Sequence, residues 1–545
     1  AIFALGRRAW NARVGLLAAA GLTLLPEAII WSGRARFYSQ LQFFTLLTAW
    51  AAFAAITTDP RDVKQTRRRL WAFAALFVLA LFSQEETLLL YPSLLLAMLL
   101  WWGWRRLLRP DVLAVHGVLL AAMAARYAIE LWGQPGYFET IQATRPYVGL
   151  VFDVAGAWRT YAPLFIASAR LPWTVLGLVG VGAALVTWAR QRGRVNALVR
   201  FHQATLFFAL QLVAVILTIF LLVGTSWREA RYLYFVQPFW LLLGAAGAVW
   251  LLDRLITGVR WRWLATAALL LGVAVSMWPG ARATLAAQVE GYDRVLAYVA
   301  ANRGEDDVIL SPQPPACALV LGPCDGYAIQ RGYEEFVIPK EGVLVDRWSG
   351  APLLNTTAQL DAAIDAAPAV WFITDSFRLA TRYDADFVRT LVEQFDVAFS
   401  ERGVLALHAQ GRRAQPPQPV TETFATPQPF GPLALVGYAR GDAVPGQELP
   451  VTLLWTSTAP VSTQYNTSLR LIGPDGSVVA QQDGPPARGI IPTTLIFDQP
   501  VPDVKALALP ADLAPGVYRL ELVAYDVATV TPLTPPQTIG TLTLP

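Results

Sequence analysis

The sequence predicts a multi-spanning α-helical membrane protein that is followed by a small α/β domain and an all-β sandwich. Three observations predict this order. Apolar stretches fill residues 1–280, Arg and Lys recur in every second gap between those stretches, and strand and turn patterns replace them after residue 280. The 55% share of hydrophobic residues and the mean hydropathy of +0.43 exceed what a soluble domain carries.

About nine membrane spans are predicted in residues 1–280. A helix needs roughly 20 apolar residues to cross a bilayer, and shorter stretches indicate a locally thinned site. The candidate spans are 12–31, 38–57, 70–84, 87–104, 112–132, 170–189, 204–225, 233–252 and 263–279.

The charge pattern gives these spans a direction. Basic loops stay in the cytoplasm, so every second gap is placed inside. Nine crossings that start inside end outside, and we therefore expect a multi-pass plasma membrane protein whose C-terminal domains are extracytoplasmic. The basic gaps are 6–13, 59–69, 105–109, 190–200 and 253–262.

Residues 281–410 are predicted to form an extracytoplasmic α/β domain. Val308 to Leu310 and Ala369 to Ile373 have the apolar composition of buried strands, and residues 357–366 and 384–395 have helical spacing. Strands that alternate with helices are typical of an α/β sheet.

A proline-containing linker, residues 411–423, separates this domain from an extracytoplasmic β-sandwich at 424–545. Alternating runs such as Leu449 to Trp455 and Tyr518 to Tyr525 are separated by turn sequences such as Gly473 to Gly476. Short strands with regular turn signals indicate a sandwich of two sheets.

The two cysteines and the overall charge argue against a zinc site and against a nucleic-acid partner. Cys317 and Cys324 are a candidate disulfide if this half lies outside the membrane, and two unpaired buried thiols are the alternative. They have no neighbouring His, so they make a poor zinc site. The net charge of +4 comes mostly from the basic gaps, which membrane orientation explains, so we expect no nucleic-acid partner.

Several short motifs resemble one family of membrane enzymes. Gly6 to Ala19, Trp31 to Tyr38 and Trp227 to Tyr234 are similar to segments of GT-C type membrane glycosyltransferases, in particular the bacterial relatives of protein O-mannosyltransferases and aminoarabinose transferases. The sandwich resembles the C-terminal domain of such proteins from Chloroflexota-type bacteria. Its matching segments are Pro445–Gly446, Gln481 to Asp483 and Leu513 to Tyr518.

The resemblance implies a reaction and its partners. The family transfers a sugar from a polyprenyl-phosphate donor to a glycan or protein acceptor on the outer face of the bilayer. Its catalytic Asp lies in the first external loop, which we expect upstream of Ala1 because residues 1–5 read as the end of a helix. We therefore expect that the N-terminal part is missing and that the chain as given is inactive.

Four arginines at the predicted outer ends of helices are candidates for the donor phosphate. Guanidinium groups bind phosphate through two parallel hydrogen bonds, whereas interfacial arginines that reach the lipid headgroups are the alternative. The candidates are Arg34, Arg36, Arg228 and Arg231.

Glu85 and Glu86 lie at the tip of a predicted helical hairpin and are the candidate catalytic carboxylates within this sequence. A carboxylate at membrane depth is costly and therefore suggests a function, such as orienting an acceptor or holding a divalent cation. A solvated turn is the alternative, and no cofactor is required by any motif.

Two other functions compete with the transferase. A non-catalytic membrane scaffold or assembly subunit would keep the same fold, and a transporter would use broken spans. The sequence shows no paired inverted halves, which disfavours the transporter.

Overall fold

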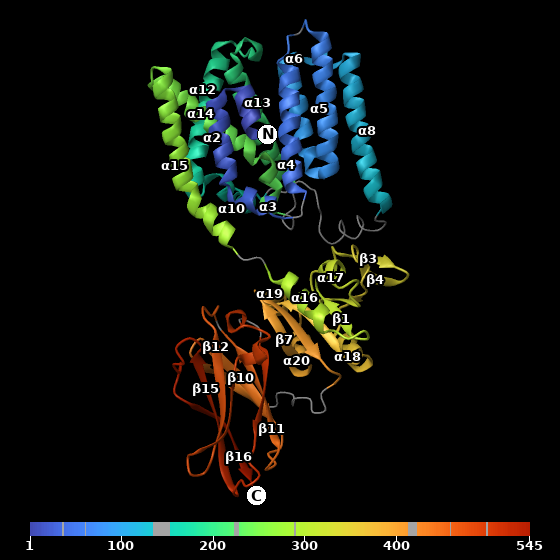
Figure 1. Ribbon diagram of the computed structural model, residues 1–545, viewed down its shortest axis with the longest axis vertical. Coiled ribbons are helices and arrows are strands. Elements are labelled where there is room, and N and C mark those ends of the chain that lie inside the picture. Colours follow the sequence, from blue (N-terminus) through green and yellow to red (C-terminus); the bar gives the residue numbers. More distant parts are fainter. Residues whose placement is uncertain are drawn as a thin grey trace. The chain divides into compact units, whose positions relative to one another are not determined.

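The structure is a computed structural model that describes residues 1–34, 37–59, 61–133, 153–222, 228–287, 290–412, 422–457, 459–496 and 500–544. It contains two compact units, Ala1–Ala287 and Gln288–Pro545. The first is helical, and the second holds a mixed α/β sheet and antiparallel sheets (Figure 1). The predicted fold class is thus confirmed.

The first unit is a bundle of long helices joined by short helical turns. The long helices are α2 (Ala12–Thr23), α4 (Tyr38–Ile56), α5 (Val63–Ser83), α6 (Tyr91–Trp102), α8 (Pro110–Gly133), α12 (Leu171–Arg190), α13 (Arg200–Leu222), α14 (Gln237–Leu255) and α15 (Val259–Ala286). The short helices are α1 (Ile2–Ala9), α3 (Pro26–Ser32), α7 (Trp104–Leu107), α10 (Val154–Tyr161) and α11 (Pro163–Ile166), with 3-10 turns η1 (Glu85–Leu90), η2 (Ser168–Arg170), η3 (Val195–Ala197) and η5 (Ala230–Val236).

Six helical segments of the described residues are long and apolar enough to cross a membrane, and the pair α2–α3 makes a seventh if it is one span. Two predicted spans fall outside this group. α5 opens with Lys64 and three arginines, and α6 has only 12 residues after η1. The number of nine spans therefore stays a prediction.

The predicted span 12–31 is bent and consists of two helices. α2 ends at Thr23, α3 begins at Pro26, and the two axes differ by 67°. Proline has no backbone N–H and disfavours helical geometry in the preceding residue, so the helix ends before Pro26 and restarts with it. α3 thus leads toward the start of α4 at one end of the bundle (Figure 1).

The five basic gaps lie at the other end, which we call the basic end. The Arg13 guanidinium lies 2.8 Å from the Asp253 carboxylate, and Arg262 lies 3.2 Å from it, which joins the first and fifth gaps. Arg200 lies over Phe53 near the end of α4, and Asn196 donates to the Trp101 carbonyl at the end of α6. These contacts also bring the middle gaps together.

The opposite end, which we call the site end, contains α3, η1, α10, η5 and the last turns of α15. A Cβ on Gly280 of α15 would lie 3.6 Å from the Pro26 ring of α3, so the two helices approach closely here. The chain therefore leaves the helical unit at the site end, shortly before α16 (Tyr292–Asn302) begins.

The second unit begins with a six-stranded mixed sheet in the order β5-β2-β1-β6-β8-β7. Its strands β5, β2, β1 and β6 run parallel. β8 is antiparallel to β6, and β7 is antiparallel to β8, so β7 runs in the same direction as β6. The strands are β1 (Val308–Ser311), β2 (Gly326–Ala328), β5 (Leu353–Leu354), β6 (Val370–Asp375), β7 (Asp396–Glu401) and β8 (Val404–Ala409). Around them lie α17 (Pro314–Val320), α18 (Thr357–Ala366), α19 (Ser376–Thr381), α20 (Ala385–Gln394) and the hairpin β3 (Val337–Lys340) to β4 (Val343–Asp346).

Two four-stranded antiparallel sheets follow, in the orders β14-β11-β10-β9 and β13-β12-β15-β16. Leu453 and Trp455 of the first sheet and Leu469 and Leu520 of the second are fully buried in one apolar core, as in a β-sandwich. The strands are β9 (Glu422–Phe430), β10 (Leu433–Arg440), β11 (Glu448–Thr456), β12 (Tyr465–Ile472), β13 (Val478–Gly484), β14 (Val501–Ala508), β15 (Gly516–Asp526) and β16 (Gln537–Leu544); η6 (Pro486–Gly489) and η7 (Thr493–Leu495) connect β13 to β14.

Candidate functional site

Arg228 is the most buried of the predicted phosphate-binding arginines that the structure describes. Its side chain is 5% exposed, and its Nη1 donates a hydrogen bond of 2.6 Å to Oδ2 of Asp153. Within the described residues, its Nε and Nη2 are buried and have no hydrogen-bond partner. These two nitrogens form one edge of the guanidinium, and that edge is the fork that binds an oxyanion in a bidentate manner.

Arg231 lies one helical turn further along, in η5. Its Nη2 donates a hydrogen bond of 2.6 Å to Glu229, and its guanidinium lies over the Tyr232 ring at 5.5 Å. Its Nε is buried without a partner in the described part of the chain. η5, which carries Arg231 and begins two residues after Arg228, packs against α4, α10, α13 and α14.

Glu86 faces the same cluster from η1. Its Oε2 is buried and has no hydrogen-bond partner among the described residues, and its carboxyl lies within electrostatic range of Arg231 and Tyr38. Glu86 lies in the turn between α5 and α6, outside the membrane-spanning helices. Burial, together with the neighbouring charge of Glu85, raises its pKa to about 8.

Glu85, which the sequence does not distinguish from Glu86, has a different surrounding. Its carboxylate forms an ion pair with Arg126 of α8 at 3.8 Å, and both side chains are partly exposed. The 3-10 turn thus separates the two neighbouring carboxylates: Glu86 joins the arginine cluster, and Glu85 pairs with α8.

The other two predicted arginines are not placed in this cluster. Arg34 is exposed, and its guanidinium lies over the Trp31 ring at 5.2 Å. Trp31 in turn contacts Tyr38, with ring centroids 4.3 Å apart, so Arg34 borders the cluster through two aromatic rings. Arg36 lies outside the described residues.

Asp153 is a residue of this site that the sequence argument missed. Its Oδ1 accepts a hydrogen bond of 2.9 Å from the amide of Gly156 and caps α10, while its Oδ2 binds Arg228. The Gly156 amide first, and Arg228 second, hold the pKa of this carboxyl below its usual value. An Asp before a helical stretch is a recognisable N-cap signal, but the pairing spans 75 residues of sequence.

Metal binding is not supported by a ligand cluster. Among the described residues, no group of three or more His, Cys, Asp or Glu side chains is placed to hold a metal ion. A divalent cation at Glu85 and Glu86 stays a prediction.

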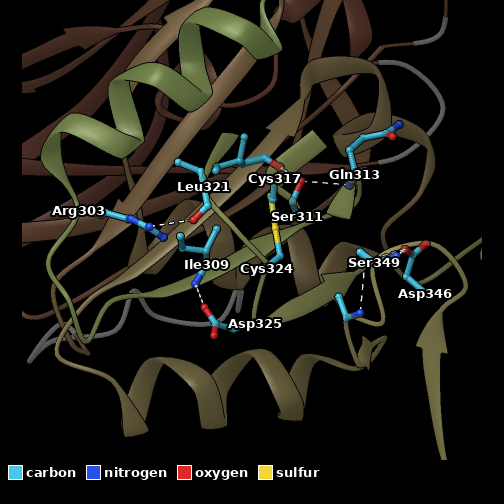
Figure 2. Close-up of a disulfide and its surroundings, with 12 residues drawn as sticks. Arg303, Ile309, Ser311, Gln313, Cys317, Leu321, Cys324, Asp325, Asp346 and Ser349 are labelled. Atoms are coloured by element: carbon cyan, nitrogen blue, oxygen red, sulfur yellow. Dashed lines mark hydrogen bonds between the residues drawn. A yellow bond between two sulfur atoms is a disulfide. The ribbon is translucent and has the colours of Figure 1, made fainter. Parts of the chain in front are cut away.

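Cys317 and Cys324 form a disulfide in the second unit (Figure 2). The bond ties α17 to the segment before β2. Nearby, the backbone N–H of Gln313 donates to the Ser311 hydroxyl at 3.1 Å, and the backbone N–H of Ile309 donates to the Asp325 carboxylate at 2.7 Å. The disulfide thus reinforces the connection between two parallel strands.

The fold and the cluster together define a helical membrane protein with buried, partly unpaired arginines at one end and a two-part α/β and β-sandwich unit after its last span. Two solved structures similar to this chain are of ArnT from Cupriavidus metallidurans, one bound to undecaprenyl phosphate and one in the apo state. Each match covers 74% of this chain and 80% of that chain at 15% identity, with TM-scores of 0.46 and 0.48 respectively. No protein-family model and no curated protein sequence matches the chain.

Proposed function

We propose that this protein is a membrane glycosyltransferase that takes a sugar from a polyprenyl-phosphate donor and transfers it to an extracytoplasmic glycan or protein. The observation that carries the proposal is the buried edge of Arg228, whose Nε and Nη2 have no partner among the described residues. A buried, unpaired donor on a charged group is costly, so the site suits an anion that fills it.

A lipid phosphate has the chemistry that this edge requires. Two phosphate oxygens match the Nε and Nη2 donors, and the Nε of Arg231, three residues further along the chain, offers a third donor. During transfer the sugar leaves a phosphate whose charge grows, and fixed guanidinium donors stabilise that charge without reorganising. The cluster would thus both hold the donor and favour departure of its phosphate.

Glu86 completes the site. With a pKa of about 8 its carboxyl is mostly protonated at neutral pH, so it adds no negative charge beside the phosphate. A buried carboxyl at this position is also the candidate group for orienting an acceptor hydroxyl. Glu85 is the weaker candidate because its charge is paired with Arg126.

The extracytoplasmic orientation is part of the proposal. The positive-inside rule places the basic end in the cytoplasm, which puts the site end outside. The chain also leaves the helical unit at the site end, so the second unit would share that compartment.

The test is binding of undecaprenyl phosphate to the purified chain in lipid nanodiscs. Arg228→Ala should weaken binding by about tenfold to a hundredfold, the range expected for losing charge-assisted hydrogen bonds, and Arg231→Ala should weaken it less. Arg36→Ala belongs in the same series because Arg36 stays a predicted phosphate ligand. Arg282→Ala is the matched control, since Arg282 is exposed on α15 at the same end of the bundle.

The scaffold hypothesis predicts a different result. Asp153 and Glu229 already pair with the two arginines, as they would in a purely structural cluster. Wild-type protein that shows no affinity for undecaprenyl phosphate, or an Arg228→Ala variant that binds it unchanged, would favour the scaffold and contradict the transferase.

A further inference from the structure

We propose that Asp153 and Gly156 are positioning residues that hold the Arg228 guanidinium so that its Nε and Nη2 edge stays open to the phosphate of the lipid donor. This inference rests on the proposed function and adds residues from α10, which no sequence motif assigns to the site.

The contacts of Arg228 support separate roles for its nitrogens, one that binds Asp153 and two that stay open to a phosphate. Asp153 occupies only Nη1, at 2.6 Å, and leaves the adjacent Nε and Nη2 without a partner in the described part of the chain. A carboxylate that engaged the side edge in a bidentate manner would block the phosphate. Bound as it is, Asp153 restrains the guanidinium without filling the fork.

Gly156 allows this arrangement because it has no side chain. A Cβ at this position would lie 2.6 Å from Nη1 of Arg228 and would also collide with the Asp153 carboxylate. The ion pair therefore packs directly on the first turn of α10. The same turn supplies the amide that binds the other Asp153 oxygen at 2.9 Å.

The segment that carries Asp153 is itself fixed to the bundle. Tyr161 of α10 is fully buried and contacts the Phe220 ring of α13, with centroids 5.6 Å apart. Further along the segment, in η2, Nη2 of Arg170 donates to both carboxylate oxygens of Glu27 in α3, at 2.7 and 2.8 Å. Asp153 thus lies directly before a helix whose other end packs against the bundle.

The direction in which removal of the Asp153 charge changes phosphate affinity distinguishes a positioning role from simple electrostatic repulsion. Asp153 is an anion close to the proposed anion site, so its charge alone would repel a phosphate. If repulsion were its main effect, Asp153→Ala would bind undecaprenyl phosphate more tightly than wild type. If positioning dominates, the same variant binds more weakly because the Arg228 fork is no longer held in place.

The experiment measures the affinity of the purified chain in nanodiscs for undecaprenyl phosphate, together with the melting temperature of each variant. We expect Asp153→Ala to weaken binding by about tenfold, by analogy with the loss of a charge-assisted contact. Asp153→Asn keeps an acceptor oxygen for Arg228 and should recover most of the affinity. Asp111→Ala is the control, because it removes a carboxylate that pairs with an arginine, Arg109, at the basic end and should leave affinity unchanged.

A second variant tests the packing of the Asp153–Arg228 pair on α10 without changing any charge. Gly156→Ala should weaken binding several-fold, because the added methyl group displaces the ends of two flexible side chains and spares the backbone. Gly182→Ala of α12, where a Cβ meets nothing within 4 Å, is the matched control and should bind as wild type.

The outcomes of the two proposals can be told apart. Wild-type protein that does not bind undecaprenyl phosphate overturns the proposed function and this inference with it. Loss of binding in Arg228→Ala, with unchanged or tighter binding in Asp153→Ala and Gly156→Ala, overturns the positioning role alone. An affinity loss in Asp111→Ala equal to that in Asp153→Ala would also overturn it, because the effect would then be one of general stability.

Discussion

Unpaired nitrogens on buried arginines distinguish the candidate site from the other basic clusters of the bundle. Among the described residues, Arg13 and Arg106 each leave one buried nitrogen without a partner, whereas Arg228 leaves two adjacent ones. A single unpaired nitrogen is a small cost, but an empty fork matches the shape of an oxyanion. This difference makes Arg228, rather than the more numerous arginines of the basic end, the residue on which the proposed function depends.

Glu86 gives the site a pH dependence whose sign can be worked out. Its pKa in the folded protein is about 8, above the ordinary value of 4.5, so the folded protein keeps the proton until the pH rises through about 8. Above that pH the carboxylate becomes charged and competes with the donor phosphate for Arg231. We expect affinity for undecaprenyl phosphate to fall between pH 7 and pH 9.

Glu86→Gln should remove this dependence, because the amide is neutral at every pH. Its melting temperature should also exceed that of wild type by more at pH 9 than at pH 6, since only wild type then buries a charge. Glu85→Gln, which alters the paired neighbour, should keep most of the pH dependence. A wild-type affinity that is flat from pH 7 to pH 9 would contradict the role given to Glu86.

At the scale of elements, the sequence predicted where helices lie better than how they connect. Every predicted span overlaps a helix, because apolar composition alone marks such segments. The bend at Pro26 was available from the sequence, since proline ends helices. The sequence did not predict the 3-10 form of η1 and η5. The turn of η1 directs Glu86 and Glu85 to different partners.

α12 and α14 pack closely against each other near their midpoints. A Cβ on Gly180 would lie 2.9 Å from the Cα of Gly247, and one on Gly247 would overlap the Leu176 carbonyl. Small residues let membrane helices approach closely. We expect Gly247→Ala to destabilise the protein by about 1–3 kcal/mol, the usual cost of overpacking, seen as a lower melting temperature in detergent.

Gly272→Ala is the control for this substitution, because a Cβ on that residue of α15 meets nothing within 4 Å. Equal melting temperatures for Gly247→Ala and Gly272→Ala would show that the contact between α12 and α14 is looser than described.

At the scale of the whole molecule, composition predicted the succession of a helical unit, an α/β sheet and a sandwich. Composition could not predict which distant segments of the chain pair with each other. The strand order β5-β2-β1-β6-β8-β7 and the contact between Asp153 and Arg228 both join distant segments, and a single sequence holds no signal for such pairs. The site was therefore predicted as a set of arginines and glutamates, without the aspartate that pairs with the most buried arginine.

Orientation in the membrane is the remaining property that the charge pattern predicts, and single cysteines test it. Cys317 and Cys324 are joined in a disulfide, so the wild-type chain should react with a maleimide only after reduction. Arg61→Cys, exposed near the basic end, should be labelled only in permeabilised cells, because basic loops stay in the cytoplasm. Ser32→Cys, exposed at the site end, should be labelled in intact cells by the same membrane-impermeant reagent. Labelling of Arg61→Cys in intact cells, with protection of Ser32→Cys, would invert the topology and place the candidate site in the cytoplasm, where an extracytoplasmic acceptor is out of reach.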